Sequence, residues 1–209
     1  MNLDDRVPIY VGANGPTALA ATGAYGDGRV SAGTEPTRVM QNNMERVRRG
    51  AEAAGRALPH DFHTSVLTYA CVLKAGESLE SDRVIEETGA PIVSSLHFWC
   101  ELMLQRGNDG FIQDDIRAEW EDYKAYVDGM PLERRHQTLH EGHCAFLPEQ
   151  ERRFITPTMI RATLGLVGEP DEIKEYIAEM AKAGVKEVLL LPPVKCAREN
   201  FRDFAEVVY

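Results

Sequence analysis

Residues 8–30, PIYVGANGPTALAATGAYGDGRV, constrain the fold of this chain more than any other stretch. They predict a buried strand at 8–12, a glycine turn, and a helix opened by Pro16. A Gly-Asp-Gly turn then leads into a second strand at 29–33. A strand, a helix and another strand in so short a stretch form a βαβ unit, from which parallel sheets are built. We therefore expect an α/β protein with a parallel sheet.

The rest of the chain predicts two more strands and several helices. The β-branched run at 63–73 predicts a long strand covered on both faces, and EVLLL at 187–191 predicts a fourth strand. A helix capped by Thr34 and closed by Gly55 follows the second strand, because apolar residues recur there at helical spacing. The other expected helices cover 78–88, 92–105, 113–127, 131–140, 156–164, 170–184 and 198–208.

Four strands, each followed by helical material, favour a barrel of the (β/α)8 type. A complete barrel of that type has eight strands and typically about 250 residues. The chain has 209 residues and supplies four predicted strands. We therefore expect half of a TIM-type barrel, in a single domain of residues 1–209, with a helical insertion at 76–165 before the last strand.

Composition narrows the possible partners and the compartment. The net charge of -10 argues against nucleic-acid binding, which needs clustered Lys and Arg. No apolar run approaches the roughly 18–20 residues that span a bilayer, and the start of the chain has no signal-peptide core. The 4 cysteines are widely spaced, which is typical of reduced thiols. These features predict a cytoplasmic protein with no membrane segment.

The turn Asn14-Gly15-Pro16-Thr17 is the strongest candidate binding site. Glycine lets a ligand approach the backbone closely, and proline is accommodated at a helix start. The free N–H groups there, the Thr17 hydroxyl and the Asn14 amide suit a phosphate. An ordinary βα turn closed by Gly-Pro is the structural alternative.

Two further positions lie at the predicted carboxyl ends of strands, where barrels of this type place ligands. Gly33 and Thr34 follow the second strand and are candidates to line a cofactor, although Thr34 can equally serve as a helix cap. Thr68 or Tyr69 on the third strand is a candidate to point into the barrel, and alternation alone does not decide which.

A histidine cluster raises the question of a metal. His136 and His140 are spaced i, i+4 and share a helical face with Glu141 and His143 close behind. The sequence is His-Glu-Gly-His rather than HExxH, and Gly142 is expected to end the helix. We therefore predict no metal site.

Arg152 and Arg153 precede an expected helix cap at Thr156-Pro157. They can bind a phosphate or form an exposed charge pair, and the sequence favours neither. No Ser/His/Asp or Cys/His arrangement has a recognisable spacing, so the catalytic residues are unknown.

Residues 8–30 resemble the middle of luciferase-like, flavin-dependent oxidoreductases. In both, an apolar strand leads to a small-residue turn ending in Gly-Pro, then to an Ala/Leu-rich helix and a Gly-Asp-Gly turn. The end of the chain also resembles that family, in RFITP at 153–157, in GEPDEI at 168–173, where many relatives have Thr or Ser at Glu169, and in AGV at 183–185. Together these motifs span residues 6 to about 193.

The resemblance implies that the four strands are the last four of a luciferase-like barrel. It implies a cofactor site at the first turn and the end of the second strand, made of Gly12, Ala13, Asn14, Gly15, Pro16, Thr17, Gly33 and Thr34. The Gly-Pro turn is closer to the branch that uses the deazaflavin F420, with FMN as the alternative. The implied reaction is hydride transfer or monooxygenation on a small organic substrate.

A half-barrel needs completion, since it exposes sheet edges and an apolar interior. A homodimer or a partner chain can supply the other half. Two alternatives to an enzyme completed in this way are a non-catalytic cofactor-binding or structural remnant and a fragment of a longer enzyme.

Overall fold

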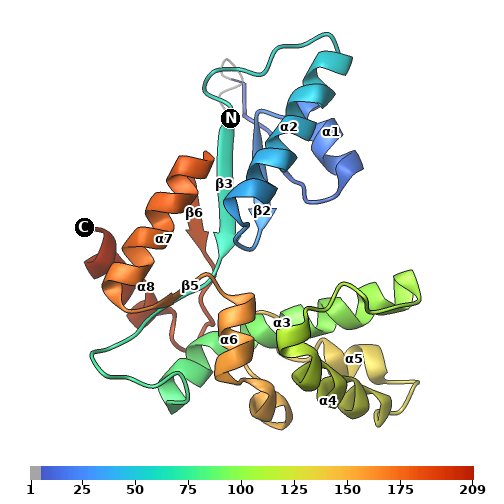
Figure 1. The fold of residues 1–209 in the computed structure, drawn as a ribbon, viewed down its shortest axis with the longest axis vertical. Coiled ribbons are helices and arrows are strands. Elements are labelled where there is room, and N and C mark those ends of the chain that lie inside the picture. Colours follow the sequence, from blue (N-terminus) through green and yellow to red (C-terminus); the bar gives the residue numbers. More distant parts are fainter. Residues whose placement is uncertain (1–5) are drawn as a thin grey trace. The chain divides into compact units, whose positions relative to one another are not determined.

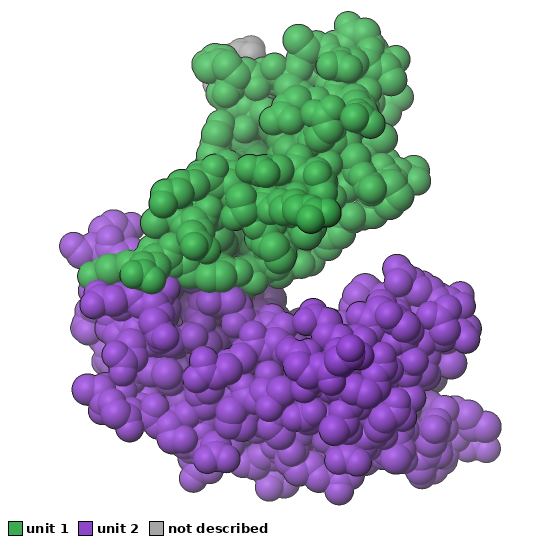
Figure 2. Space-filling view, viewed as in Figure 1, with its two compact units in different colours: residues 1–68, 174–190 green, residues 69–173, 191–209 purple. Residues whose placement is uncertain are grey.

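The computed structural model of the protein describes residues 6–209 (Figure 1). The chain divides into two compact units (Figure 2). Unit 1 comprises residues 1–68 and 174–190, and unit 2 comprises residues 69–173 and 191–209. Each unit is described by itself.

Unit 1 is built on a parallel sheet of four strands in the order β1-β2-β3-β6. The strands are β1 (Tyr10–Gly12), β2 (Gly28–Ala32), β3 (His63–Thr68) and β6 (Glu187–Leu190). Gly12 of β1 pairs with Val30 of β2, and Val66 of β3 pairs with Val188 of β6. The predicted α/β fold with a parallel sheet is confirmed, and each of its four strands overlaps a strand expected from the sequence.

Two helices of unit 1 pack unusually closely against each other. They are α1 (Pro16–Tyr25) and α2 (Thr37–Ala53). A Cβ added at Gly23 of α1 would lie 1.8 Å from the Val47 carbonyl oxygen, and one at Gly50 of α2 would lie 2.1 Å from that of Ala20. Leu19 and Val47 are completely buried in the core beneath this contact. Small residues therefore allow the two helix backbones to touch.

Two predicted boundaries in unit 1 are wrong. Thr34 is no helix cap, because α2 begins at Thr37 and its cap is Pro36. The third strand does not run to residue 73, because β3 ends at Thr68 and β4 (Ala70–Val72) belongs to another sheet. Apolar character is continuous across this break, so the sequence gives no sign of the change of sheet.

Unit 2 is mostly helical. It contains a two-stranded parallel sheet of β4 and β5 (Leu166–Gly168), and the sequence analysis missed β5. Around a large core lie α3 (Asp82–Arg106), η1 (Asp114–Ile116), α4 (Arg117–Asp128), α5 (Arg135–Leu139), η2 (Glu149–Phe154) and α6 (Pro157–Thr163). The last helix, α8 (Ala197–Val208), packs against β4. The helix α7 (Pro170–Ala183) links unit 2 to unit 1 in the sequence. The predicted stripe Ile116, Trp120, Tyr123 and Val127 is buried, and Thr156 caps α6 as expected.

The two helices expected at 78–88 and 92–105 form one helix, α3, which continues through Pro91. A proline inside a helix removes a hydrogen bond and costs about 3 kcal/mol. Burial offsets this cost, because Ala90, Pro91 and Ile92 are all buried. Among residues 6–209 no helix, α3 included, is both long and apolar enough to cross a membrane.

The contact between α1 and α2 gives a stability prediction. Gly23→Ala should lower the free energy of unfolding by about 1–3 kcal/mol, the usual cost of overpacking a tight contact. Gly12→Ala is the matched control, because a Cβ there would meet nothing within 4 Å. Urea denaturation followed by circular dichroism measures both variants. Equal midpoints for Gly23→Ala and Gly12→Ala would contradict the packing described.

Candidate functional site

The predicted turn lies directly after β1 and forms the start of α1. Ala13 is 2% exposed, and its N–H donates to the Val30 carbonyl at 3.1 Å, which fixes the turn to β2. Gly15 is the cap residue of α1 and makes no side-chain cap bond, and Pro16 occupies the first turn. The turn is therefore rigid on its sheet side and open on its outer side.

The start of α1 offers backbone donors at this turn. The first N–H groups of an α-helix have no partner within the helix, which here concerns Thr17 and Ala18. A Cβ built at Gly12 or at Gly15 would meet nothing within 4 Å, so neither glycine is needed for packing. Asn14 and Thr17 are exposed beside them. Unpaired amide donors at a helix start, next to uncrowded glycines, suit an anion such as a phosphate.

The segment after β2 is the second part of the predicted site. Gly33 has a φ of +83°, which favours glycine, and its N–H donates to the Leu67 carbonyl at 2.8 Å. A Cβ at Gly33 would also meet nothing within 4 Å. Thr34 is half-buried. Both segments therefore follow the carboxyl ends of neighbouring strands.

A buried arginine that the sequence analysis missed connects these two segments. Arg29 on β2 is 1% exposed, and its Nε donates to the Ala13 carbonyl oxygen at 2.9 Å. Its two terminal nitrogens donate to both carboxylate oxygens of Glu35, at 2.8 and 2.6 Å. Asn43 donates to Glu35 at 2.9 Å. One side chain thus holds both the turn after β1 and the segment after β2.

This bracing fixes the electrostatics of the site. The bidentate Glu35 carboxylate balances the Arg29 charge, so the guanidinium is not available to an outside anion. A phosphate at the turn would therefore rely on neutral donors: backbone N–H groups, the Thr17 hydroxyl and the Asn14 amide. The one signal in the sequence was an arginine placed within a strand, at a position where a charge has to find a buried partner.

The Gly-Asp-Gly turn before β2 has a structural role. The Ile9 N–H donates to Asp27 at 2.9 Å, and Arg6 pairs with the same carboxylate at 2.7 Å. The Ile9 N–H, together with Arg6, holds the pKa of the Asp27 carboxyl below its usual range. A Cβ at Gly28 would lie 2.7 Å from Tyr10 and 2.9 Å from the His63 carbonyl oxygen. This half of the motif therefore serves packing at the amino ends of the strands.

A surface hollow of about 820 Å³ also lies at the amino ends of the strands in unit 1. Arg48, Arg56, Phe62 and Lys186 are among the residues that line it. Since barrels of this type bind ligands at the carboxyl ends of their strands, the hollow is not the candidate site.

In unit 2 the two arginines predicted as phosphate ligands already have partners. Arg152 pairs with Asp82 and Glu86, each at 2.7 Å. Arg153 lies over the rings of Tyr126 and Phe154, at 5.3 and 4.7 Å from their centres. Both arginines therefore contact groups of the chain itself, carboxylates for Arg152 and aromatic rings for Arg153.

Burial keeps Tyr69, Cys71 and Cys100 of unit 2 in their neutral forms. Burial raises the pKa of the Cys100 thiol to about 12 and raises those of Cys71 and Tyr69 as well. Thiolates are the reactive form of cysteine, so neither buried cysteine has the character of a nucleophile. Thr68 is buried, at 2% exposure.

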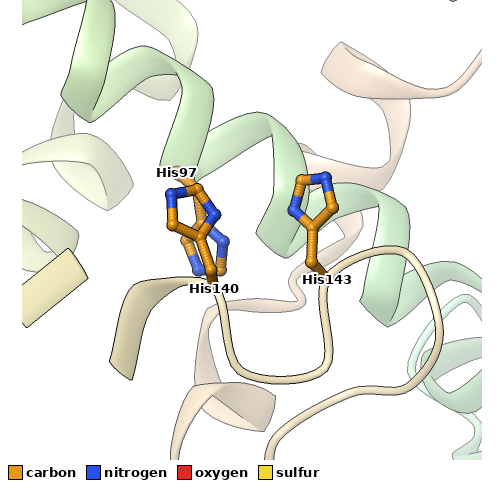
Figure 3. A group of neighbouring side chains, drawn as sticks. All are labelled: His97, His140 and His143. Carbon is orange, nitrogen blue, oxygen red and sulfur yellow. The ribbon is translucent and has the colours of Figure 1, made fainter. Parts of the chain in front are cut away.

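The histidine cluster differs from the predicted one. His140 and His143 lie close to His97 rather than to His136 (Figure 3).

Comparison with known proteins identifies the family. The luciferase-like monooxygenase family matches residues 2–187, and the chain belongs to this family. An F420-dependent glucose-6-phosphate dehydrogenase of Nakamurella multipartita is 26% identical over 131 residues, which cover 62% of this chain and 33% of that protein. A 5,10-methylenetetrahydromethanopterin reductase of Methanopyrus kandleri is 23% identical over 194 residues, 93% of this chain and 47% of that protein.

Solved structures agree on the fold. The coenzyme F420-dependent tetrahydromethanopterin reductase of Methanopyrus kandleri superposes with a TM-score of 0.55 at 22% identity, over 88% of this chain and 44% of that one. An F420-dependent secondary alcohol dehydrogenase, in complex with an F420-acetone adduct, superposes with a TM-score of 0.51 at 17% identity. The match covers 99% of this chain and 50% of that one. The chain thus spans half or less of the length of these relatives.

The Arg29 brace gives a second stability prediction. Arg29→Met should destabilise the protein by about 3–5 kcal/mol, the cost of leaving a buried ion without its partner. The double variant Arg29→Met/Glu35→Met should be less damaging than Arg29→Met alone, because it removes both charges. Urea denaturation of the three proteins forms the test.

The control for this prediction is Arg49→Met, which breaks an exposed pair with Glu45 on α2. Exposed pairs contribute little, so its midpoint should stay close to that of the parent. A midpoint for Arg29→Met that matches the control would refute the brace.

Proposed function

We propose that this protein is an F420-dependent oxidoreductase of the luciferase-like class that acts on a small organic substrate. The observation that carries the proposal is the turn after β1, with its uncapped helix start, its open glycines and its brace from Arg29. The relatives named above support F420 over FMN, since the glucose-6-phosphate dehydrogenase and both solved structures are described as F420-dependent.

The residues present fit one part of that cofactor. F420 carries a phosphate, and the N–H groups of Thr17 and Ala18 together with the Thr17 hydroxyl would hold it. Gly12, Gly15 and Gly33 leave room for it, since a Cβ at each would meet nothing within 4 Å. The deazaflavin ring, when bound, supplies the hydride chemistry, while the protein supplies position and electrostatics.

We further propose that a second half-barrel completes the active site. The sheet of unit 1 has four parallel strands with β1 and β6 at its edges, whereas a closed barrel has eight. The match to the 5,10-methylenetetrahydromethanopterin reductase covers 47% of that protein, which is consistent with a missing second half. A second copy, a partner chain or another segment of a longer protein can supply the missing strands.

Cofactor binding is the direct test. Titration of the purified chain with F420, followed by fluorescence, should show saturable binding that is tighter than that of FMN. Gly15→Val should weaken F420 binding by about tenfold or more, or 1.4 kcal/mol, because its side chain fills the space beside the amide donors. Gly15 has a φ of -85°, which valine accepts. Gly110→Val, in an exposed turn, is the matched control and should bind as the parent does.

These titrations also separate the two candidate functions. Binding accompanied by reduction or oxidation of F420 with a carbon substrate supports the enzyme. Binding without turnover under any tested substrate supports a non-catalytic cofactor-binding protein. If neither F420 nor FMN binds, or if Gly15→Val binds like Gly110→Val, the proposed site is wrong.

Association tests the half-barrel. Size-exclusion chromatography with light scattering should give a mass of about twice 23.3 kDa for the chain alone, since paired sheet edges satisfy backbone groups that water otherwise covers. F420 should shift the population further toward the pair if the site forms between the two halves. A stable monomer at all concentrations, with F420 bound, would contradict completion by a second copy.

A further inference from the structure

Three histidines of unit 2 come together from two separate segments of the chain. His97 lies on α3, while His140 and His143 lie on the turn that follows α5 (Figure 3). One ring nitrogen from each lies within 4.8 Å of the others. The ring centres of His97 and His140 are 5.9 Å apart, and those of His140 and His143 are 5.5 Å apart.

The turn that carries two of these histidines is fixed onto α3. The Cys144 N–H donates to the Ser94 hydroxyl at 3.2 Å, and His140 Nε2 lies 3.0 Å from Glu101 Oε1. Ser94, His97 and Glu101 are spaced by three and four residues, so they lie along one face of α3. Gly142, with a φ of +71°, turns the chain between the two histidines. The cluster is therefore held by contacts on both sides of His97.

His97 provides an independent sign of a ligand. Its side chain is 1% exposed, and its Nε2 lies 3.1 Å from the Glu151 carboxylate. Tyr123 donates to the same Glu151 oxygen at 2.7 Å. Nδ1 of His97, however, is buried and has no hydrogen-bond partner. Buried polar atoms are almost always paired, so an orphaned ring nitrogen beside two further imidazoles calls for a partner.

We propose that His97, His140 and His143 bind a divalent transition metal ion, with Zn²⁺ the best match. Neutral imidazole nitrogen is a preferred ligand of Zn²⁺, and three histidines with one open position form a known arrangement. The carboxylates of Glu151 and Glu101 hold Nε2 of His97 and His140, which leaves Nδ1 of each ring for the metal. A carboxylate behind a ligating histidine is the usual means of orienting it.

The spacing requires a small adjustment on binding. Nitrogens around a tetrahedral Zn²⁺ lie about 3.3 Å apart, given Zn–N bonds of about 2.0–2.1 Å. The histidines begin within 4.8 Å, and two of the three, His140 and His143, are exposed and can rotate. The bound ion would tie the turn after α5 to α3. This site is independent of the proposed F420 function, which concerns unit 1.

The test uses the tag-free chain after removal of metals with a chelator. Calorimetric titration with ZnCl₂ should give one ion per chain, and Co²⁺ should give the intense visible bands of a tetrahedral complex. His140→Ala and His143→Ala should each weaken Zn²⁺ binding by at least about tenfold. These two exposed residues can be replaced without opening the core, whereas His97→Ala would create a buried cavity.

His136→Ala is the matched control, because His136 is an exposed histidine of the neighbouring α5 and lies outside the cluster. It should bind Zn²⁺ as the parent does. Zn²⁺ should also raise the thermal midpoint of the parent and of His136→Ala, but not that of His143→Ala. Absence of binding by the parent, or equal loss in His136→Ala and His143→Ala, would overturn the proposal.

Discussion

The buried ion pair between Arg29 and Glu35 is the interaction on which the candidate site depends. A guanidinium at 1% exposure is tolerated only if its donors are satisfied, and three of its bonds reach chain segments that follow two different strands. This requirement determines where the turn after β1 lies and why α2 begins two residues later than a Thr34 cap would place it. The pair therefore acts on geometry rather than on ligand charge.

This arrangement separates the parts of the Gly-Pro to Gly-Asp-Gly stretch that build the fold from those that can bind. Gly28 and Asp27 are occupied by packing and by hydrogen bonds at the amino ends of the strands. Gly12 and Gly15 are needed by nothing within the chain and border open amide donors. A glycine that no packing requires, beside an uncapped helix start, is the feature that distinguishes a binding turn from an ordinary βα turn.

Sequence periodicity predicted the four strands of the main sheet and the buried stripe of α4, because local patterns of burial decide both. It failed where a distant partner decides the structure. The apolar run at 63–73 divides between two sheets, because its second part, β4, pairs with β5, almost a hundred residues further along the chain. α3 passes through Pro91 because the core around it compensates the lost hydrogen bond. Arg29 was missed for the same reason, since only the folded chain brings Glu35 to it.

The histidine cluster also depends on a residue that is distant in the sequence. His136 and His140 share a helical spacing, so local reasoning paired them and then rejected a metal because the next histidine broke the pattern. The folded chain replaces His136 with His97, which lies 39 residues earlier and already has the Glu151 carboxylate behind it. The two candidate sites then differ in kind: neutral backbone donors in unit 1 suit an anion, whereas imidazoles backed by Glu101 and Glu151 in unit 2 suit a cation. Because one proposed ligand is an anion and the other a cation, the two sites do not compete for a ligand, and each can be tested independently of the other.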